Sequence, residues 1–533
     1  MLAAATAAAL AAGSAQAKEP SHWVKCDGLP KPEGAGTTLA RIGAVVMTGG
    51  LLGLPEGQRE VPAASGAAGV QACTAALADP ALGDIWARKA SLLRSRALHH
   101  AEADDLPAAL ADLQAVKPVT TGRVGADYFA RSAGVSIQLF EAAVLARQNR
   151  LAEAEALAVK AADARPWSNQ VQSLASAILA IDPTWTAEED RVLTRRAALN
   201  PSTLLGRAAA REWGNAAGAA DDWARTADTM GAMLKAWEGP GVLTGGQDPK
   251  LEMLILYPRA LAKAALTAAR VGRDDQARER MTQLKALKPW TPPVPVKGRR
   301  AEFLAPITTA SKTAAEKTLE AYQPIIDAQL LANAGKTTEA AALLKEKSLP
   351  LDPGVIELLT KVSGEQSGGP DVASELRRER LERLDVVEYA KALPILETRP
   401  NRSPFTSQGP YGFRSNNGFL DRVNKTTGGR TIEYSGNLAQ PVVEELLLLR
   451  AAQLAREAKA PRFAVTDKRD FKRYHVTTMY GAETSRTANG FESQADIVFA
   501  DAGGDAGLTL DADKVWTELS PFYVFEPAKP ARR

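Results

Sequence analysis

Histidine and cysteine are scarce in this chain of 533 residues, which contains four histidines and two cysteines. A metal pair on a helix needs ligands four residues apart, whereas His99 and His100 are adjacent and point to different helix faces. The acidic run over 501–513 fails the EF-hand pattern, because Gly503 and Ala512 occupy its third and twelfth positions. No Walker-type phosphate loop is present either. The sequence therefore predicts no metal site and no cofactor.

An excess of one charge and a long apolar run are also missing. The net charge is only +3, and lysine and arginine are scattered among acidic residues, which argues against a nucleic-acid partner. No stretch reaches the 18 apolar residues of a transmembrane helix, so no integral membrane span is expected. Aromatic residues make up 6% of the chain while alanine is abundant, which favours closely packed helices over a β-rich core. The length predicts more than one domain.

The first residues have the pattern of a secretory signal. Residues 1–17 form a short apolar run that ends in Ala15-Gln16-Ala17, a small-residue cleavage pattern, and the run stops abruptly at Lys18. No lysine or arginine precedes the run. We predict a signal peptide over residues 1–17 and a periplasmic or cell-envelope location. The alternative is an alanine-rich helix of the mature protein.

The two cysteines, Cys26 and Cys73, form the only possible pair in the chain. In an oxidising compartment such a pair predicts a disulfide. Residues 18–65 are rich in glycine and proline and predict an extended arm, which the bond would attach to the first helix. Two free thiols in a reducing compartment are the alternative.

Four segments share one pattern, in which a small polar turn is followed by an alanine-rich helix: 103–109, 148–154, 271–277 and 334–340. The second helix of each opens on a small residue, and another small residue lies twelve positions earlier. Small residues at this spacing let two helices cross closely. A proline soon after, at 118, 166, 289 or 353, is expected to end the second helix. The paired residues are Ala97 and Ala109, Ala142 and Ala154, Ala265 and Ala277, and Ala328 and Ala340.

This pattern resembles the tetratricopeptide repeat, whose units are helix hairpins of about 34 residues. The resemblance covers residues 66–362 with gaps, and it departs from the family in lacking the aromatic positions and in irregular separations. It implies a mostly α fold, a helical-hairpin solenoid with a groove that binds a protein or peptide. An irregular all-α domain of helical hairpins is the alternative.

Three basic residues mark the candidate binding site of this solenoid. The first-helix positions that face the groove in tetratricopeptide proteins fall on Arg259, Lys263 and Arg270. A basic groove would hold a carboxylate or an acidic peptide through charge-assisted hydrogen bonds. A solvated basic helix face is the alternative.

The periodicity changes after residue 362. Residues 363–396 predict a linker and a charged helix over 371–396, and the stretch 398–418 is rich in proline, asparagine, serine and glycine like a domain boundary. Residues 397–527 then predict a small α+β domain. Its expected elements are strands at 430–434, 462–466, 474–479 and 495–500, a turn at 435–437 and a buried helix over 441–459 whose Glu444 and Glu445 complement the helix dipole.

This second domain resembles a family of small bacterial envelope lipoproteins. The matching segments are 409–413, the turn at 434–437, the helix at 444–455 and the strand at 462–465, in that order. The chain departs from the family at Gln453, where glutamate is favoured, and it has no lipid-anchor cysteine beside the domain. The resemblance implies an envelope location and no known activity.

The sequence contains no reliable catalytic signature, so no catalytic residue is assigned and an enzyme is not expected. The function favoured by the two resemblances is an exported periplasmic or envelope scaffold that binds a protein or peptide partner through its helical-repeat groove. The alternative is an uncharacterised envelope enzyme in the C-terminal domain, for which His475, Asp467 and Asp470 are the residues to test.

Overall fold

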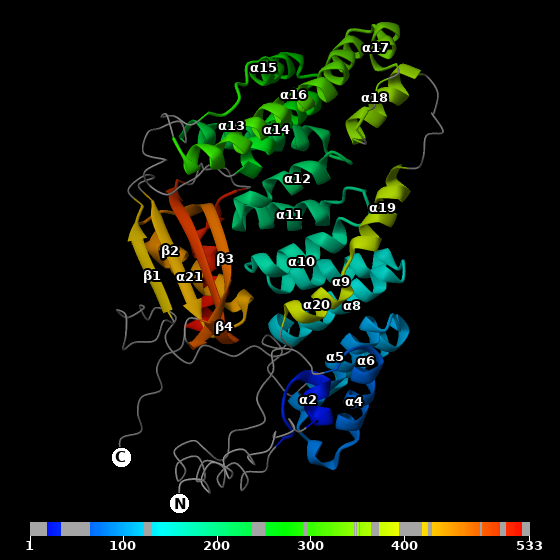
Figure 1. Cartoon of the computed structure of the whole chain (residues 1–533), viewed down its shortest axis with the longest axis vertical. Coiled ribbons are helices and arrows are strands. Elements are labelled where there is room, and N and C mark those ends of the chain that lie inside the picture. The colour runs from blue at the N-terminus through cyan, green and yellow to red at the C-terminus, as the bar shows by residue number, and fades with distance from the viewer. Residues whose placement is uncertain are drawn as a thin grey trace, which may run out of the picture.

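The structure is a computed structural model of the chain. It describes residues 19–32, 64–121, 130–236, 251–291, 297–345, 347, 349–350, 352–363, 372–393, 418–424, 429–479, 482–501 and 508–524. A long stack of helices is followed by a small antiparallel sheet with its own helices (Figure 1). The predicted fold class, a mostly α protein with a small C-terminal α+β domain, is confirmed. The predicted signal peptide over 1–17 lies outside the described residues.

The helices of the stack follow one another as packed neighbours, each in contact with the next along the chain. They are α4 (Gly66–Ala78), α5 (Trp86–Glu102), α6 (Leu106–Thr120), α8 (Val135–Arg147), α9 (Leu151–Ala164), α10 (Asn169–Leu179), α11 (Ala187–Leu199), α12 (Leu204–Arg211), α13 (Ala216–Ala236), α14 (Leu251–Arg270), α15 (Asp274–Lys285), α16 (Arg299–Asn333), α17 (Thr337–Leu344) and α18 (Pro353–Ser363).

All four predicted polar turns join two helices in the same way. The turn residue has a left-handed backbone in each, with φ of 59° at Asp104, 59° at Asn149, 76° at Gly272 and 80° at Gly335. The next backbone N–H then donates to a carbonyl five residues earlier, as Lys336 does to Leu331 at 2.9 Å. This is the Schellman ending, in which a left-handed residue closes one helix and directs the chain into the next.

The paired alanines are buried, as expected where two helices of a hairpin pack closely. All eight, from Ala97 to Ala340, have no exposed surface. The prolines behave less uniformly than expected. Pro118 lies inside α6, which continues to Thr120, and Pro353 opens α18 instead of closing α17. The helix hairpins are therefore established, while their membership of the tetratricopeptide family stays a prediction.

The arm over residues 18–65 is partly helical where the structure describes it. Helix α2 (His22–Asp27) buries Trp23 and Cys26, and Cys26 is bonded to Cys73 of α4 with the two Cα atoms 4.7 Å apart. The predicted disulfide is confirmed. The rest of its cluster comes from α4, the following turn and α5, so the bond fixes the arm to the first helices.

The predicted charged helix over 371–396 is in fact two helices, α19 (Val372–Arg383) and α20 (Val386–Ala392). They run antiparallel to α10, because Arg380 donates to the carbonyl of Ala180, Tyr389 to that of Leu174 at 3.0 Å, and Gln170 to that of Ala392 at 2.9 Å. Asp385, which caps α20, separates the two helices. Figure 1 shows the segment crossing back over the stack after α18.

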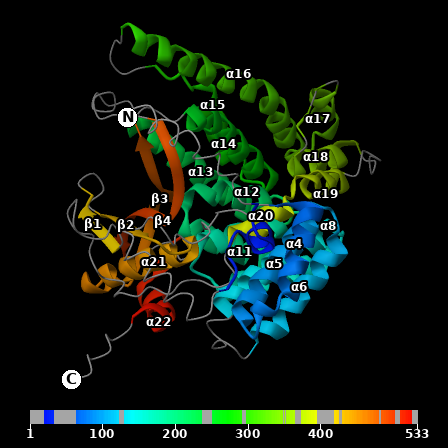
Figure 2. The ribbon, with the colours of Figure 1, turned by 60° about the horizontal axis from the view of Figure 1, so that its bottom comes forward.

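The C-terminal domain is a five-stranded antiparallel sheet in the order β1-β2-β4-β3-β5. Helix α21 (Gln440–Glu457) packs on β2, β3 and β4, and α22 (Ala512–Tyr523) packs on α21 (Figure 2). The strands are β1 (Gly418–Val423), β2 (Arg430–Gly436), β3 (Arg462–Met479), β4 (Ala482–Ala500) and β5 (Leu510–Asp511).

The strand predictions were right in place and wrong in length. The segment 474–479 is the continuation of β3 rather than a separate strand, and the expected turn at 435–437 begins inside β2. Helix α22, capped by Asp511, was not predicted. Of the proposed domain boundary at 398–418, all but Gly418 lies outside the described residues.

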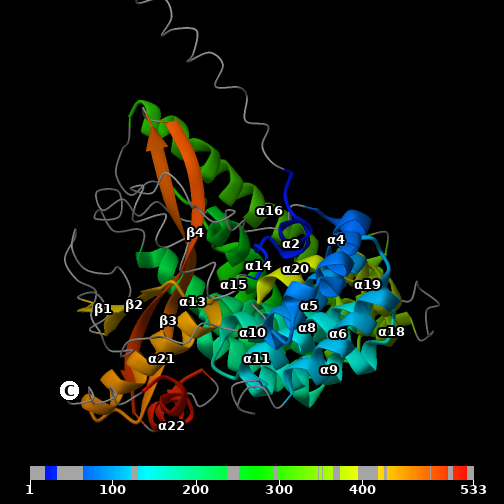
Figure 3. The same ribbon diagram turned by 90° about the horizontal axis from the view of Figure 1, so that it is seen from below.

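The sheet and α19 lie at opposite ends of α10 and α11 (Figures 1 and 3). Trp167, Ala198 and Leu199 from the helical stack are part of the hydrophobic core of the C-terminal domain. The two parts are therefore one packed unit in the described chain. Within it, no helix is both long and apolar enough to cross a membrane.

Candidate functional site

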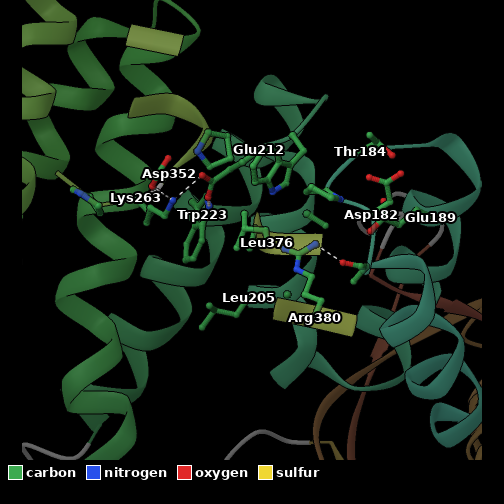
Figure 4. A pocket seen from close by; sticks show the side chains of 18 of the residues that line it. Asp182, Thr184, Glu189, Leu205, Glu212, Trp223, Lys263, Asp352, Leu376 and Arg380 are labelled. Carbon is green, nitrogen blue, oxygen red and sulfur yellow. Dashed lines mark hydrogen bonds and ion pairs between the residues drawn. The ribbon is translucent and has the colours of Figure 1, made fainter. Parts of the chain in front are cut away.

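A cavity of about 380 Å³ opens in the helical stack where α19 crosses the ends of α10 and α11. We call the first helices of the successive pairs, α5, α8, α10, α12, α14 and α16, the first-helix face. Helix α20 packs on α5 and α8 and reaches α10 through Tyr389, whereas residues of α12, α14 and α16 line the cavity. Figure 4 shows its wall, which includes Asp182, Glu189, Leu205, Glu212, Trp223, Lys263, Asp352, Leu376 and Arg380.

Lys263, one of the three predicted groove residues, lies in this wall but is not a free cation. Its ammonium Nζ is 2.6 Å from Glu212 Oε2 and also donates to Asp352, and all three side chains are buried. Burial alone would lower the pKa of Lys263, but the two carboxylates raise it above its ordinary value. Two acids share one base, so this cluster has one negative charge in excess when both acids are ionised.

Glu212 has a second hydrogen-bond donor besides Lys263. It accepts a hydrogen bond from Trp223 Nε1 at 2.6 Å, and the ring of Trp223 lies 5.7 Å from Lys263 Nζ. Burial raises the pKa of Glu212 to about 7, and the neighbouring Asp352 adds to this while Lys263 opposes it.

The other two predicted groove residues lie on the same helix, α14, with different surroundings. Arg270 is held by Glu357, at 2.6 Å from its Nε, and by the backbone carbonyl of Glu212 at 2.7 Å. Arg259 lines the cavity, is exposed and makes no ion pair with any described residue. Carboxylates therefore neutralise two of the three cations expected in the groove, while ligand binding by these three residues stays a prediction.

On the opposite wall, Glu189 of α11 is 4% exposed and makes no ion pair with a described residue. Its carboxyl group turns back to the backbone N–H of Thr186, whose hydroxyl accepts from the N–H of Glu189 at 3.1 Å. This reciprocal pair is a capping box at the start of α11. Burial raises the pKa of Glu189 to about 8, although Arg380 partly opposes it.

Helix α19 closes this side of the cavity through its arginines. Arg377 Nη2 lies 2.9 Å from Asp182, and Arg380 donates to the carbonyl of Ala180. Leu376 and Arg380 themselves line the cavity. The same chain segment thus fills one section of the first-helix face and borders the open one.

The residues of the enzyme alternative are not brought together. Asp467, Asp470 and His475 follow one another along the extended strand β3, where each residue advances the chain by about 3.3 Å. Asp470 accepts from Ser493 at 2.6 Å and pairs with Lys468 at 2.7 Å, and Asp467 pairs with Arg469 at 2.9 Å. Elsewhere in the described chain, no three His, Cys, Asp or Glu side chains are placed to hold a metal ion.

Sequence reasoning found Lys263 and Arg259 but missed Glu189, Glu212, Tyr322 and Asp352. The pattern Thr186-x-x-Glu189 signals a capping box and gives no hint of a cavity. Glu212 and Asp352 are 140 residues apart in sequence, as their numbers show, and only the fold brings them to one lysine. A scan against protein-family models found no match, and a search of curated proteins found no matching relative.

Proposed function

We propose that this protein is an exported scaffold of the periplasm or cell envelope, and that it receives a protein partner at the section of the first-helix face that α20 leaves open. The observation that carries the proposal is the cavity, whose wall contains the buried Glu189 and also Arg259, which makes no ion pair with a described residue. A cavity bordered by a buried carboxyl group and an exposed arginine, neither of which has an ion-pair partner among the described residues, favours a site that a ligand completes.

The chain's own α19–α20 segment supports this assignment. Gln170 and Arg94 of the helical stack donate to backbone carbonyls of this segment, and Arg380 of the segment donates to the carbonyl of Ala180 in the stack. Buried apolar residues of the segment, such as Tyr389 and Leu393, join the core of α5, α8 and α10. A partner segment of similar build would be held by the same kinds of contact.

Export is supported by the disulfide, because such bonds persist in oxidising compartments and are rare in the cytosol. The first residues add to this through their signal-like pattern. Fractionation of cells that make the chain tests the location, and recovery from the cytosol with residues 1–17 intact would contradict it.

Partner binding is tested by placing a photo-crosslinking amino acid at Arg259 in the full chain. The matched control is the same substitution at Arg278 of α15, whose side chain is 59% exposed on a second helix. We expect one defined partner adduct at 259 and none at 278. The same adducts at both positions, or none at 259, would contradict the proposal.

A further inference from the structure

We infer that the cavity binds an organic cation, an ammonium or guanidinium group, which a side chain of the partner supplies. The inference deepens the proposed function and rests on it only for the source of the cation. The first argument is the charge of the buried wall. Among its charged residues that are buried, three are acids (Glu189, Glu212 and Asp352) and only Lys263 is a base.

Two further cations lie at the margin of the cavity. Arg380 is half-buried and already donates to the carbonyl of Ala180, while Arg259 is exposed to solvent. A ligand that enters the buried part therefore meets carboxyl groups first. A desolvated cation beside Glu189 would favour the ionised carboxylate and gain an ion pair and charge-assisted hydrogen bonds, whereas an anion would gain neither the ion pair nor a counter-charge.

Aromatic groups supply the remaining surface that a cation needs. Trp213, Trp223 and Tyr322 line the cavity, and the face of an indole ring attracts an ammonium or guanidinium group. Tyr322 is 6% exposed, and its hydroxyl has no hydrogen-bond partner among the described residues. It can accept a hydrogen bond from an N–H donor. A volume of about 380 Å³ accommodates one such side chain and no larger element.

The protonation of the wall provides a signature for this ligand. The pKa values of Glu189, about 8, and Glu212, about 7, leave both carboxyl groups partly protonated at pH 7 in the empty site. A bound cation favours their ionised forms, so binding expels protons into the solvent. An anionic or neutral ligand would expel none.

The test is calorimetric titration of the full chain at pH 7 in two buffers of different ionisation enthalpy. The probes are N-acetyl-lysine amide and N-acetyl-arginine amide, with the matched neutral N-acetyl-norleucine amide, the anionic N-acetyl-glutamate amide and the free diamine putrescine. We expect the cationic amides to bind with proton release. Glu189→Gln should weaken them by at least about tenfold and reduce the release, whereas Glu188→Gln, at an exposed position on the same helix, should change neither.

Binding of the glutamate probe in preference to the cations would overturn the inference, and so would cation binding that ignores Glu189. If putrescine alone binds, with the same dependence on Glu189, the cation site stands and the partner as its source is wrong. If the cations bind while no adduct forms at Arg259, the proposed partner fails and the cation site remains. Gln is accepted at the third position of a capping box, so Glu189→Gln is expected to fold.

Discussion

Arg165, at the end of α9, holds Glu445 of α21 with two hydrogen bonds, of 3.1 Å from Nε and 3.0 Å from Nη2. Both side chains are buried, and Arg131 and Tyr523 also donate to the same carboxylate. The bond joins the helical stack to the C-terminal domain across 280 residues of sequence. The expectation that Glu445 serves the dipole of its own helix is therefore incomplete, because its charge is neutralised by another part of the chain.

Glu445→Gln is expected to destabilise the protein by about 3–5 kcal/mol, because it leaves Arg165 buried without its counter-charge. Urea unfolding measures the difference. The matched control is Glu382→Gln, which removes the exposed pair with Arg378 on α19 and should change the free energy of unfolding by less than about 0.5 kcal/mol. Equal effects of the two variants would mean that the buried pair does not stabilise the domain contact.

Acid should weaken the same contact. Burial alone would raise the pKa of Glu445, but Arg131 and Arg165 hold it below its ordinary value. A depressed folded pKa gives stability that is present above the unfolded value of about 4.3 and lost as the pH falls below it. The free energy of unfolding should therefore fall more steeply between pH 5 and pH 3 in the wild type than in Glu445→Gln. Parallel curves would contradict this.

Glu189 should show the opposite pH dependence. Its raised pKa of about 8 contributes stability that is complete below about pH 4.3 and is lost as the pH rises to 8. The glutamine of Glu189→Gln cannot ionise. The free energy of unfolding of this variant should therefore rise relative to that of the wild type by a few kcal/mol as the pH increases from 5 to 9. Urea unfolding at both pH values checks this, with Glu188→Gln as the exposed control. A constant difference across that range would show that Glu189 is not buried in its acidic form.

The sequence predicted the features that depend on neighbours along the chain. Polar turns, alanines twelve residues apart and strand alternation at 430–434 are local patterns, and the structure confirms each of them. The length of a strand was harder to predict from the sequence. The pairing of β3 with β4 continues past the apolar stretch that marks a strand in the sequence.

The site depended on contacts that no local pattern contains. Lys263 was identified by its helix position, yet its charge is set by Glu212 and Asp352, which come from other elements. Likewise, the charged composition of α19–α20 predicted a helix but not its place along α10. The fold decides which distant acidic and basic residues form ion pairs. The sequence alone could therefore not tell a groove with free cations from one whose cations are neutralised by carboxylates.

The Cys26–Cys73 disulfide should stabilise the fold by about 4 kcal/mol, because it closes a loop with a sequence separation of 47. Replacing both cysteines by serine should lower the free energy of unfolding by about this amount, measured with urea under non-reducing conditions. Peptide mass mapping of the wild type without reductant should give one Cys26–Cys73 linked peptide. Two thiols that react freely in protein taken from the periplasm would contradict the bond and weaken the argument for export.

A glycine-to-alanine substitution at Gly335 tests the hairpin geometry, because the sign of its effect on stability depends on the backbone conformation of the turn. Gly335 has a φ of 80°, so Gly335→Ala should cost about 1 kcal/mol in backbone strain even though its Cβ would meet no other atom. Gly206 lies within α12, and a Cβ there is equally free of contacts. Gly206→Ala should instead stabilise by about 0.5–1 kcal/mol through helix propensity. Urea unfolding measures the change in the free energy of unfolding for both variants. A change of the same sign in both would contradict the left-handed helix ending at Gly335.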